Sequence, residues 1–324
     1  MQTLNLYRED FLAFMEEKVR LKEPENLYEP ILYMLNLGGK RLRPVLVLLS
    51  AEIFGTSYKK AMHAALAIEM FHNFSLIHDD IMDDAPMRRG KISVHEKWDL
   101  NTAILSGDAM LIIAYKLFEN YEGETFSKLA KLFTDTAIKV CEGQQYDVDF
   151  ETRDNVSVAE YLHMIEYKTA VLVGAALKMG AIVANASEEN TEKIFEFGRL
   201  LGIAFQLQDD YLDIFGDEEN FGKQIGGDIV ENKKTFLFLK AMEQSSKKEA
   251  SQLLHLYDLM PNDPSEKIGA IKQIFEESGA AEQTRLEIEK FTHLAFEVLN
   301  NISIDYSYKE VLKNFGKNLM NRKM

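Results

Sequence analysis

Long apolar stripes at helical spacing constrain the fold of this chain more than any other feature. Residues 61–82 carry Ile68, Phe71 and Ser75 at steps of three and four, and 191–215 show a similar stripe. Such steps place side chains on one face of an α-helix. The 324 residues include six prolines, so long helices meet few interruptions. Alternating strand patterns are nearly absent, and we predict an all-α protein.

A short run at 45–49 has the composition of a strand, but it follows Pro44 and continues into further apolar residues. Proline at the first helical position favours a helix start there. Linkers and low-complexity tracts are lacking. We therefore expect one domain over residues 1–324, built as a bundle of about ten or more helices.

Composition and charge narrow the class of protein. Hydrophobic residues make up 46% and charged residues 27% of the chain, as in ordinary soluble proteins. The net charge of −15 argues against nucleic-acid binding and against a polybasic membrane patch. An anionic substrate would need local cations or bound metal. The single cysteine, Cys141, excludes an intrachain disulfide, and we predict that it is a small buried residue in a reducing compartment.

Membrane and export signals are weak. Residues 1–26 mix charged and apolar side chains and lack the apolar run of a signal peptide. The most membrane-like stretch, 169–186, is interrupted by Lys178 and reaches only the lower limit of the ~20 residues that a span needs. We predict a buried core helix there, no membrane span, and a cytoplasmic protein.

Two acidic clusters with the pattern Asp-Asp-x-x-Asp lie 130 residues apart, each near the end of a predicted helix. They consist of Asp79, Asp80 and Asp83, and of Asp209, Asp210 and Asp213. Residues four apart share a helix face, and clustered carboxylates repel one another unless a cation lies between them. Oxygen ligands of this kind suit Mg²⁺, which also binds phosphates. A single copy is as readily a solvated acidic face, but the repetition favours a metal site.

Basic residues flank both acidic clusters. They are Lys40, Arg41 and Arg43 in a glycine-opened turn, Arg88 and Arg89 after the first cluster, and Lys223, Lys233 and Lys234 after the second. Taken singly, each is more often a solvated surface residue. In so acidic a chain, however, cations placed beside both clusters indicate phosphate binding.

These residues resemble the trans-isoprenyl diphosphate synthases, or polyprenyl synthetases, of the short-chain farnesyl and geranylgeranyl type. The resemblance runs from about Tyr28 to Thr235, and the last ninety residues share only helicity with the family. The matching motifs are Gly-Gly-Lys-Arg-Leu-Arg-Pro at 38–44, His-Asp-Asp-Ile-Met-Asp at 78–83, Arg-Arg-Gly at 88–90, Gly-Asp at 107–108, Gly-Gln at 143–144, Lys-Thr at 168–169, Phe-Gln-Leu-Gln-Asp-Asp at 205–210, Gly-Gly-Asp-Ile at 226–229 and Asn-Lys-Lys-Thr at 232–235.

The resemblance implies a helical bundle around a central cavity and a role for each motif. All six aspartates, Asp79, Asp80, Asp83, Asp209, Asp210 and Asp213, would bind Mg²⁺, three ions per active site, to hold an allylic diphosphate. Isopentenyl diphosphate would be bound by Lys40, Arg43, His72 and Arg89. The allylic diphosphate would also contact Arg88, Lys168, Lys223 and Lys233, with Thr169 and Gln206 near the reacting carbon. A lone histidine on an apolar helix is usually structural, and His78 keeps that interpretation.

The implied reaction is alkyl transfer through an allylic carbocation after diphosphate leaves. Phe71, Phe74 and the small Ser75 precede Asp79 on the same predicted helix. In the family that these residues resemble, a bulky residue at the position of Phe74 is associated with short products. The resemblance therefore implies a C15–C20 product, with geranylgeranyl diphosphate preferred. If both phenylalanines are merely core residues, the product length is set elsewhere.

Three alternatives stay open: a class I terpene cyclase, a non-catalytic subunit of a heteromeric synthase, and a purely structural helical protein. A cyclase would not need the Lys40–Arg43 cradle, and non-catalytic subunits typically lose aspartates that are complete here. A homodimer is implied by the resemblance alone.

Overall fold

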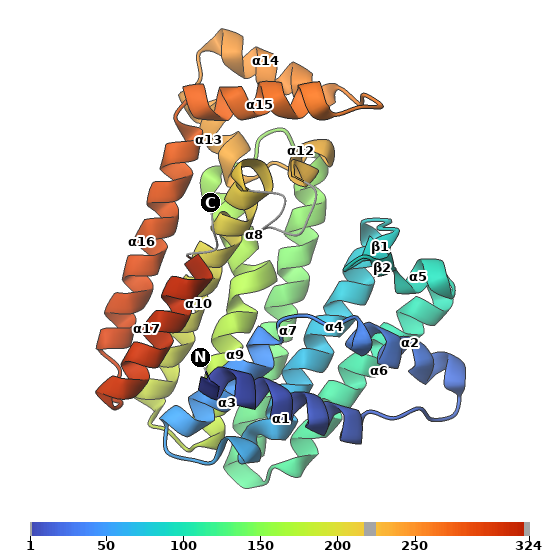
Figure 1. The fold of residues 1–324 in the computed structure, drawn as a ribbon, viewed down its shortest axis with the longest axis vertical. Coiled ribbons are helices and arrows are strands. Elements are labelled where there is room, and N and C mark those ends of the chain that lie inside the picture. Colours follow the sequence, from blue (N-terminus) through green and yellow to red (C-terminus); the bar gives the residue numbers. More distant parts are fainter. Residues whose placement is uncertain (1, 217–224, 321–324) are drawn as a thin grey trace. The chain divides into compact units, whose positions relative to one another are not determined.

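The computed structural model describes residues 2–216 and 225–320. It is 80% helical (Figure 1), which confirms the predicted all-α class. The described residues form two compact units, one from residues up to 134 together with 175–192, the other from 135–174 together with the residues from 193 onward. The prediction of a single domain over 1–324 stays a prediction.

The first unit contains the N-terminal helices and a small hairpin. Its elements are α1 (Gln2–Lys18), α2 (Glu25–Asn36), α3 (Leu42–Ile53), η1 (Tyr58–Ala61), α4 (Met62–Met82), β1 (Met87–Arg88), β2 (Lys91–Ile92), α5 (Val94–Lys97), α6 (Leu100–Leu117) and η2 (Phe118–Asn120). Three helices run from one unit into the other: α7 (Gly123–Thr152), α9 (Val171–Val183) and α10 (Glu188–Phe215).

The second unit holds the remaining helices. They are α8 (Val158–Ile165), the π-helical turn η3 (Glu166–Ala170), α12 (Gly227–Val230), α13 (Phe236–Gln244), α14 (Lys247–Asp258), α15 (Ser265–Glu277), α16 (Ala280–Asn300) and α17 (Tyr306–Met320). Capping boxes start α8 and α14, where Ser157 pairs with Glu160 and Ser246 with Glu249. These boxes satisfy amide groups that a helix start leaves without partners.

The predicted helices at 61–82 and 191–215 are confirmed as α4 and α10. The run at 45–49 is helical, as predicted, but the expected start at Pro44 is wrong. Helix α3 begins at Leu42, after Arg41 in a left-handed conformation (φ 51°). Pro44 therefore occupies the third helical position, where its missing N–H still costs no helical hydrogen bond.

Helices α4 and α6 lie side by side in the first unit (Figure 1). A Cβ atom at Gly107 of α6 would lie 2.4 Å from His78 Nε2 of α4, so this glycine permits the close approach. His78 Nε2 lies 3.3 Å from the carbonyl oxygen of Ile104. The structural interpretation of His78 is consistent with this contact.

A buried ion pair anchors the loop before α3. Arg41 donates to the Glu69 carboxylate and to the carbonyl oxygen of Leu35, and the side chains of Arg41 and Glu69 are 2% and 3% exposed. Asn73 Nδ2 donates to Glu69 Oε1 at 3.0 Å. Three cations in this turn were predicted to bind phosphate. Arg41 is one of them, and its side chain instead forms buried contacts within the protein.

The core of the second unit is mainly aromatic and aliphatic. It includes Phe236 of α13, Leu253 of α14 and Phe275 of α15, all at most 1% exposed. This core supports the end of α10, which carries the second acidic cluster, and α8, which carries Tyr161.

One further sequence prediction, on the single cysteine, is wrong. Cys141 is exposed on α7, because its position falls outside the buried stripe formed by Phe133, Thr136, Val140 and Gly143. In the described part of the chain, the segment that by length and composition could cross a membrane is Leu100–Asn120, of which 28% is buried. The stretch 169–186, predicted as the most membrane-like, contains many fully buried residues, as expected of a core helix.

Candidate active site

The first acidic cluster lies at the C-terminal end of α4. Asp80 is 1% exposed and accepts a hydrogen bond from Arg88 Nε at 2.7 Å. Arg88 Nη2 also lies 3.6 Å from Asp79 Oδ2. Burial raises the pKa of Asp80 even though Arg88 opposes the shift. Asp83 lies four residues beyond Asp79, so the two side chains share one face at the end of the helix. Asp83 is exposed.

The hairpin of β1 and β2 presents Arg88 and Arg89. Its turn residues Arg89 and Gly90 have φ angles of 53° and 73°, as in the tight turns that suit hairpins. Arg89 donates to the carbonyl oxygen of Gly38. A Cβ atom at Gly39 would lie 3.0 Å from Arg89 Cζ. Gly39 therefore makes room for this guanidinium, and Gly38 supplies the carbonyl oxygen that it binds.

A second basic pair lies on α3 and α4. Arg43 Nη1 is 3.3 Å from His72 Nε2. Burial, followed by the charges of Arg43 and Arg89, holds the pKa of His72 well below its ordinary value. A neutral imidazole can accept a hydrogen bond from Arg43 and donate one through its other nitrogen. The structure thus brings together Arg43, His72 and Arg89 from the predicted cradle, while Lys40 is exposed on the loop.

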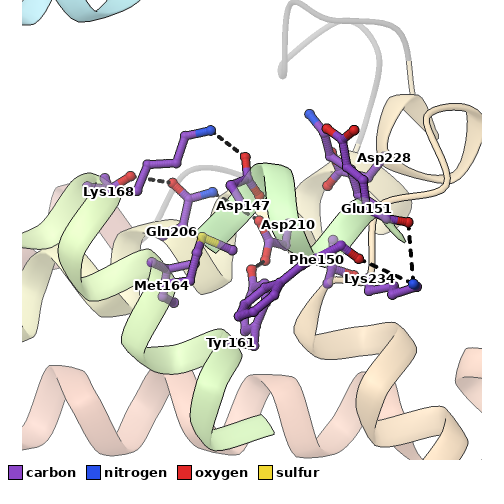
Figure 2. Close-up of a pocket in the computed structure, with 14 residues that line it drawn as sticks. Asp147, Phe150, Glu151, Tyr161, Met164, Lys168, Gln206, Asp210, Asp228 and Lys234 are labelled. Carbon is purple, nitrogen blue, oxygen red and sulfur yellow. Dashed lines mark hydrogen bonds and ion pairs between the residues drawn. The ribbon is translucent and has the colours of Figure 1, made fainter. Parts of the chain in front are cut away.

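In the second cluster, Asp210 is the most enclosed carboxylate (Figure 2). It accepts hydrogen bonds from the Tyr161 hydroxyl and, at 3.0 Å, from Gln206 Nε2. Thr169 Oγ1 donates to Gln206 Oε1 at 3.4 Å. Burial raises the pKa of Asp210 to about 7. Thr169, Gln206 and Asp210 therefore form one chain of hydrogen bonds.

The Gly-Gly-Asp motif folds around Asp213. The backbone N–H of Asp228 donates to Asp213 Oδ2 at 3.0 Å, and Gly226 N–H donates to the carbonyl oxygen of Asp213 at 2.6 Å. Gly226 adopts φ 80°. Burial, with the nearby charges of Asp210 and Asp213, raises the pKa of Asp228 well above its ordinary value. Three carboxylates thus gather at the end of α10.

Lys168 lies in the π-helical turn η3, and such turns often occur at functional sites. Its Nζ donates to Asp147 Oδ2 at 2.5 Å (Figure 2). Two glycines permit the packing of this turn. A Cβ atom at Gly143 would lie 2.2 Å from the backbone nitrogen of Lys168, and one at Gly202 would lie 2.7 Å from Cα of Ala170.

The remaining predicted cations differ in placement. Lys233 pairs with Glu231 at 2.6 Å. Although its burial opposes the charge, the hydrogen bond from Lys233 to Glu231 leaves the pKa of Lys233 raised. Lys234 turns toward backbone carbonyls, including that of Phe150 at 3.2 Å (Figure 2). Lys223 lies outside the described residues.

A cavity of about 120 Å³ joins these groups within the second unit. Its polar lining includes Asp147, Lys168, Thr169, Gln206, Asp210, Asp228 and Lys233. Carboxylates and ammonium groups meeting in one cavity provide ligands for both a cation and an anion.

The polyprenyl synthetase profile matches residues 24–277. The chain belongs to this family. It is 44% identical over 237 residues to a geranylgeranyl diphosphate synthase of Methanosarcina mazei, covering 72% of this chain and 73% of that protein. It is 39% identical to a short chain isoprenyl diphosphate synthase of Methanothermobacter thermautotrophicus, covering 87% and 86%. A crystal structure of a geranylgeranyl pyrophosphate synthase superposes with a TM-score of 0.96, at 53% identity and full coverage of both chains.

This polyprenyl synthetase is a trans-prenyltransferase, and its family uses Mg²⁺. The residues present fit that metal. Asp80 Oδ2 is buried without a hydrogen-bond partner, and burial raises the pKa of both Asp210 and Asp228. A nearby cation would stabilise the charged form of each of these three buried carboxylates.

Three site residues were not predicted as functional: Asp147, Tyr161 and Asp228. Asp228 lies in the Gly-Gly-Asp motif of the sequence, directly after Gly226 and Gly227, and this motif was the available signal. The roles of Asp147 and Tyr161 depend on contacts with residues 21 and 49 positions away. Sequence patterning carries no signal for contacts at such separations.

Proposed function

We propose that this polyprenyl synthetase condenses isopentenyl diphosphate with an allylic diphosphate and releases geranylgeranyl diphosphate, a C20 product. The observation that carries this proposal is the cavity in which Asp210 and Asp228 meet Lys168 and Lys233. Those groups suit a magnesium-bound diphosphate. Similarity to geranylgeranyl diphosphate synthases supports the C20 product.

We assign isopentenyl diphosphate to the group of Lys40, Arg43, His72 and Arg89. Two guanidinium groups can each bind phosphate oxygens in bidentate fashion. His72, held neutral, adds a hydrogen bond without adding charge, and exposed Lys40 adds a point charge. Proximity of Arg43, His72 and Arg89 supports the assignment.

We assign the allylic diphosphate to the acidic clusters and to Arg88, Lys168, Lys223 and Lys233, with three Mg²⁺ ions. When bound, Mg²⁺ neutralises charge that develops on the departing diphosphate. All six aspartates of the two motifs are proposed to hold Mg²⁺. The first and last of each motif, Asp79 and Asp83 or Asp209 and Asp213, are proposed to contact it directly. Asp80 and Asp210 contribute their charge while holding Arg88 and Gln206 in place.

Thr169 and Gln206 are the proposed neighbours of the allylic carbocation. Their oxygens are fixed by the hydrogen bonds to each other and to Asp210, so they offer oriented dipoles to the cation. The double bond of isopentenyl diphosphate attacks the cation, and the product loses a proton to the departing diphosphate. A dedicated side-chain base is not required.

Product length is proposed to depend on Phe71, Phe74 and Ser75 of α4. Phe71 is 1% exposed and packs against Phe133, with ring centroids 5.2 Å apart. Phe74 lies against His78 at 4.7 Å. Ser75 leaves space one turn below Asp79. The two rings would therefore form the floor that stops chain growth.

A homodimer is the proposed assembly, with α6 at its interface. Leu105 and Ile112 are 59% and 66% exposed, and their seven-residue separation places them on one face. Exposed apolar surface of this kind commonly marks a protein interface.

We also propose that residues 1–324 act as one catalytic domain in the cytoplasm.

The test is chromatography of products from the purified chain with Mg²⁺, labelled isopentenyl diphosphate and dimethylallyl, geranyl or farnesyl diphosphate in turn. We expect a C20 product, loss of activity with EDTA, and recovery with added Mg²⁺. Hydrocarbon release from farnesyl diphosphate alone would instead identify a terpene cyclase. Inactivity of the isolated, folded chain would indicate a non-catalytic subunit.

A further inference from the structure

A group of three possible metal ligands lies just after the first acidic cluster. The side chains of Asp84, His95 and Glu96 bring their ligand atoms within 4.8 Å of one another. Asp84 follows the end of α4, and the other two belong to α5. The group differs from both Asp-Asp-x-x-Asp motifs because it includes an imidazole.

His95 is the residue that points to a ligand. Its side chain is 9% exposed, and both ring nitrogens are buried without a hydrogen-bond partner. Nε2 lies 3.8 Å from Glu96 Oε1, too far for a hydrogen bond. Because buried polar atoms without partners are costly, this ring needs a proton donor, an acceptor or a metal beside it.

Asp84 is held at an unusual backbone position. The Ala85 N–H donates to the carbonyl oxygen of Asp80 at 2.9 Å, and the Asp84 N–H donates to that of Ile81 at 3.4 Å. These bonds form the helix-ending motif that normally places glycine at the left-handed position. Here Asp84 occupies the left-handed position with φ 48°. An aspartate in this conformation has a steric cost that glycine would avoid.

We propose that Asp84, His95 and Glu96 bind a divalent transition-metal ion of the Zn²⁺ type, separate from the catalytic Mg²⁺. One imidazole nitrogen with two carboxylates is a donor set that such ions bind well, whereas Mg²⁺ prefers oxygen ligands alone. The exposed Glu96 leaves room for water to complete the coordination.

Asp80 is a charged neighbour of the histidine. Asp80 Oδ2 is buried without a hydrogen-bond partner, and His95 is close enough to lower the pKa of Asp80. A metal-bound histidine commonly donates its second N–H to a carboxylate. Occupation of the site would therefore link α5 to Asp80, and through Asp80 to Arg88. The metal would stabilise the hairpin that carries Arg88 and Arg89.

The experiment is calorimetric titration of ZnCl₂ into the full chain in excess MgCl₂, with four proteins compared. Two variants remove ligands, His95→Gln and Asp84→Gly, and the second places glycine where the backbone favours it. The control is His293→Gln, because His293 and Glu297 form an exposed pair at 3.2 Å that lacks a buried nitrogen. Thermal unfolding of each protein is followed with and without Zn²⁺.

We expect the parent and His293→Gln to bind the same tight equivalent of Zn²⁺ and to melt at a higher temperature with it. Loss of a ligand should weaken that equivalent by about tenfold or more in His95→Gln and Asp84→Gly. The proposal is overturned if the parent binds no Zn²⁺ in excess Mg²⁺. It is equally overturned if both ligand variants bind as the parent does, because the ion would then lie at the all-oxygen clusters.

Discussion

The second aspartate of each acidic motif is buried and hydrogen-bonded by side chains. Asp80 accepts from Arg88, and Asp210 accepts from Tyr161 and Gln206. This shared arrangement separates two tasks within one short motif. The inner aspartate orients neighbouring side chains, and the aspartates at the first and last positions are the proposed metal ligands.

Removal of a proposed metal ligand should abolish turnover without unfolding the protein. We expect Asp79→Ala and Asp209→Ala each to lower kcat by about a hundredfold or more, the range seen when one preorganised electrostatic group is lost. Steady-state assays with saturating substrates measure the effect, and circular dichroism checks the fold.

The matched control is Asp135→Ala, which removes an exposed aspartate from α7 outside both motifs. It should retain normal turnover. Near-normal turnover in either motif variant would contradict the assignment of that cluster to catalysis.

The raised pKa of Asp210, about 7, makes stability of the metal-free protein depend on pH. The folded state holds this proton more tightly than the unfolded chain, whose carboxyl has an ordinary pKa near ~3.9. The stabilising contribution is therefore complete below that value and is lost as pH rises through about 7. Thermal unfolding in EDTA is measured from acidic to mildly alkaline pH. As the pH rises, the melting temperature should fall less for Asp210→Asn than for the parent. Equal declines would contradict the raised pKa.

The carboxylate pattern and the flanking cations were predictable because their spacing along one helix or turn defines them locally. The different contacts that the individual cations make were not predictable. Arg41 and Arg43 are two residues apart and chemically identical, yet one pairs with Glu69 in the core and the other lies beside His72. The choice depends on the left-handed conformation at Arg41, which sequence patterning does not specify.

At the scale of elements, the π-helical turn η3 depends on a glycine in the neighbouring helix. We expect Gly143→Ala to destabilise the protein by roughly 1–3 kcal/mol, as overpacking does, and to lower activity because the new methyl group displaces Lys168. Denaturant unfolding measures the free energy. The control is Gly269→Ala on α15, where nothing lies within 4 Å of a new Cβ and a gain of about 0.5–1 kcal/mol is expected. A neutral Gly143→Ala would contradict this account.

Product length should respond to the side chains below Asp79 on α4. Phe74→Ala enlarges the proposed floor and should extend the product by at least one isoprene unit, as should Phe71→Ala. Ser75→Phe should shorten it. Chromatography of the released products after dephosphorylation gives the answer, with exposed Phe126→Ala as the control. Unchanged products in all three variants would place the floor elsewhere.

The long helices were predictable from apolar periodicity, as α4 and α10 demonstrate. Shorter elements were not, for physical reasons. The strands β1 and β2 have two residues each, too few for an alternating pattern, and they exist because Arg89 and Gly90 form a tight turn. The apolar residues of the π-helical turn have the same spacing as those of α8 and α9, so the sequence pattern does not distinguish the turn from an α-helix. Its close packing against Gly143 and Gly202 is visible only in the structure.

At the scale of the whole molecule, the exposed face of α6 should determine the oligomeric state. We expect Leu105→Glu and Ile112→Glu to convert a dimer to a monomer, because charge at an apolar interface loses its solvation. Light scattering coupled to size-exclusion chromatography measures the mass. Leu6→Glu, at an exposed position of α1, should remain dimeric. A parent chain of monomeric mass would remove the proposal.

The buried pair of Arg41 and Glu69 restricts how this protein can evolve. Loss of either partner alone would leave an uncompensated charge in the interior, at a cost of about 3–5 kcal/mol, which is a large part of the stability of most proteins. Joint replacement by apolar residues avoids that penalty. Descendants of this chain should therefore keep both residues or exchange both together, and the loop that carries Lys40 inherits that constraint.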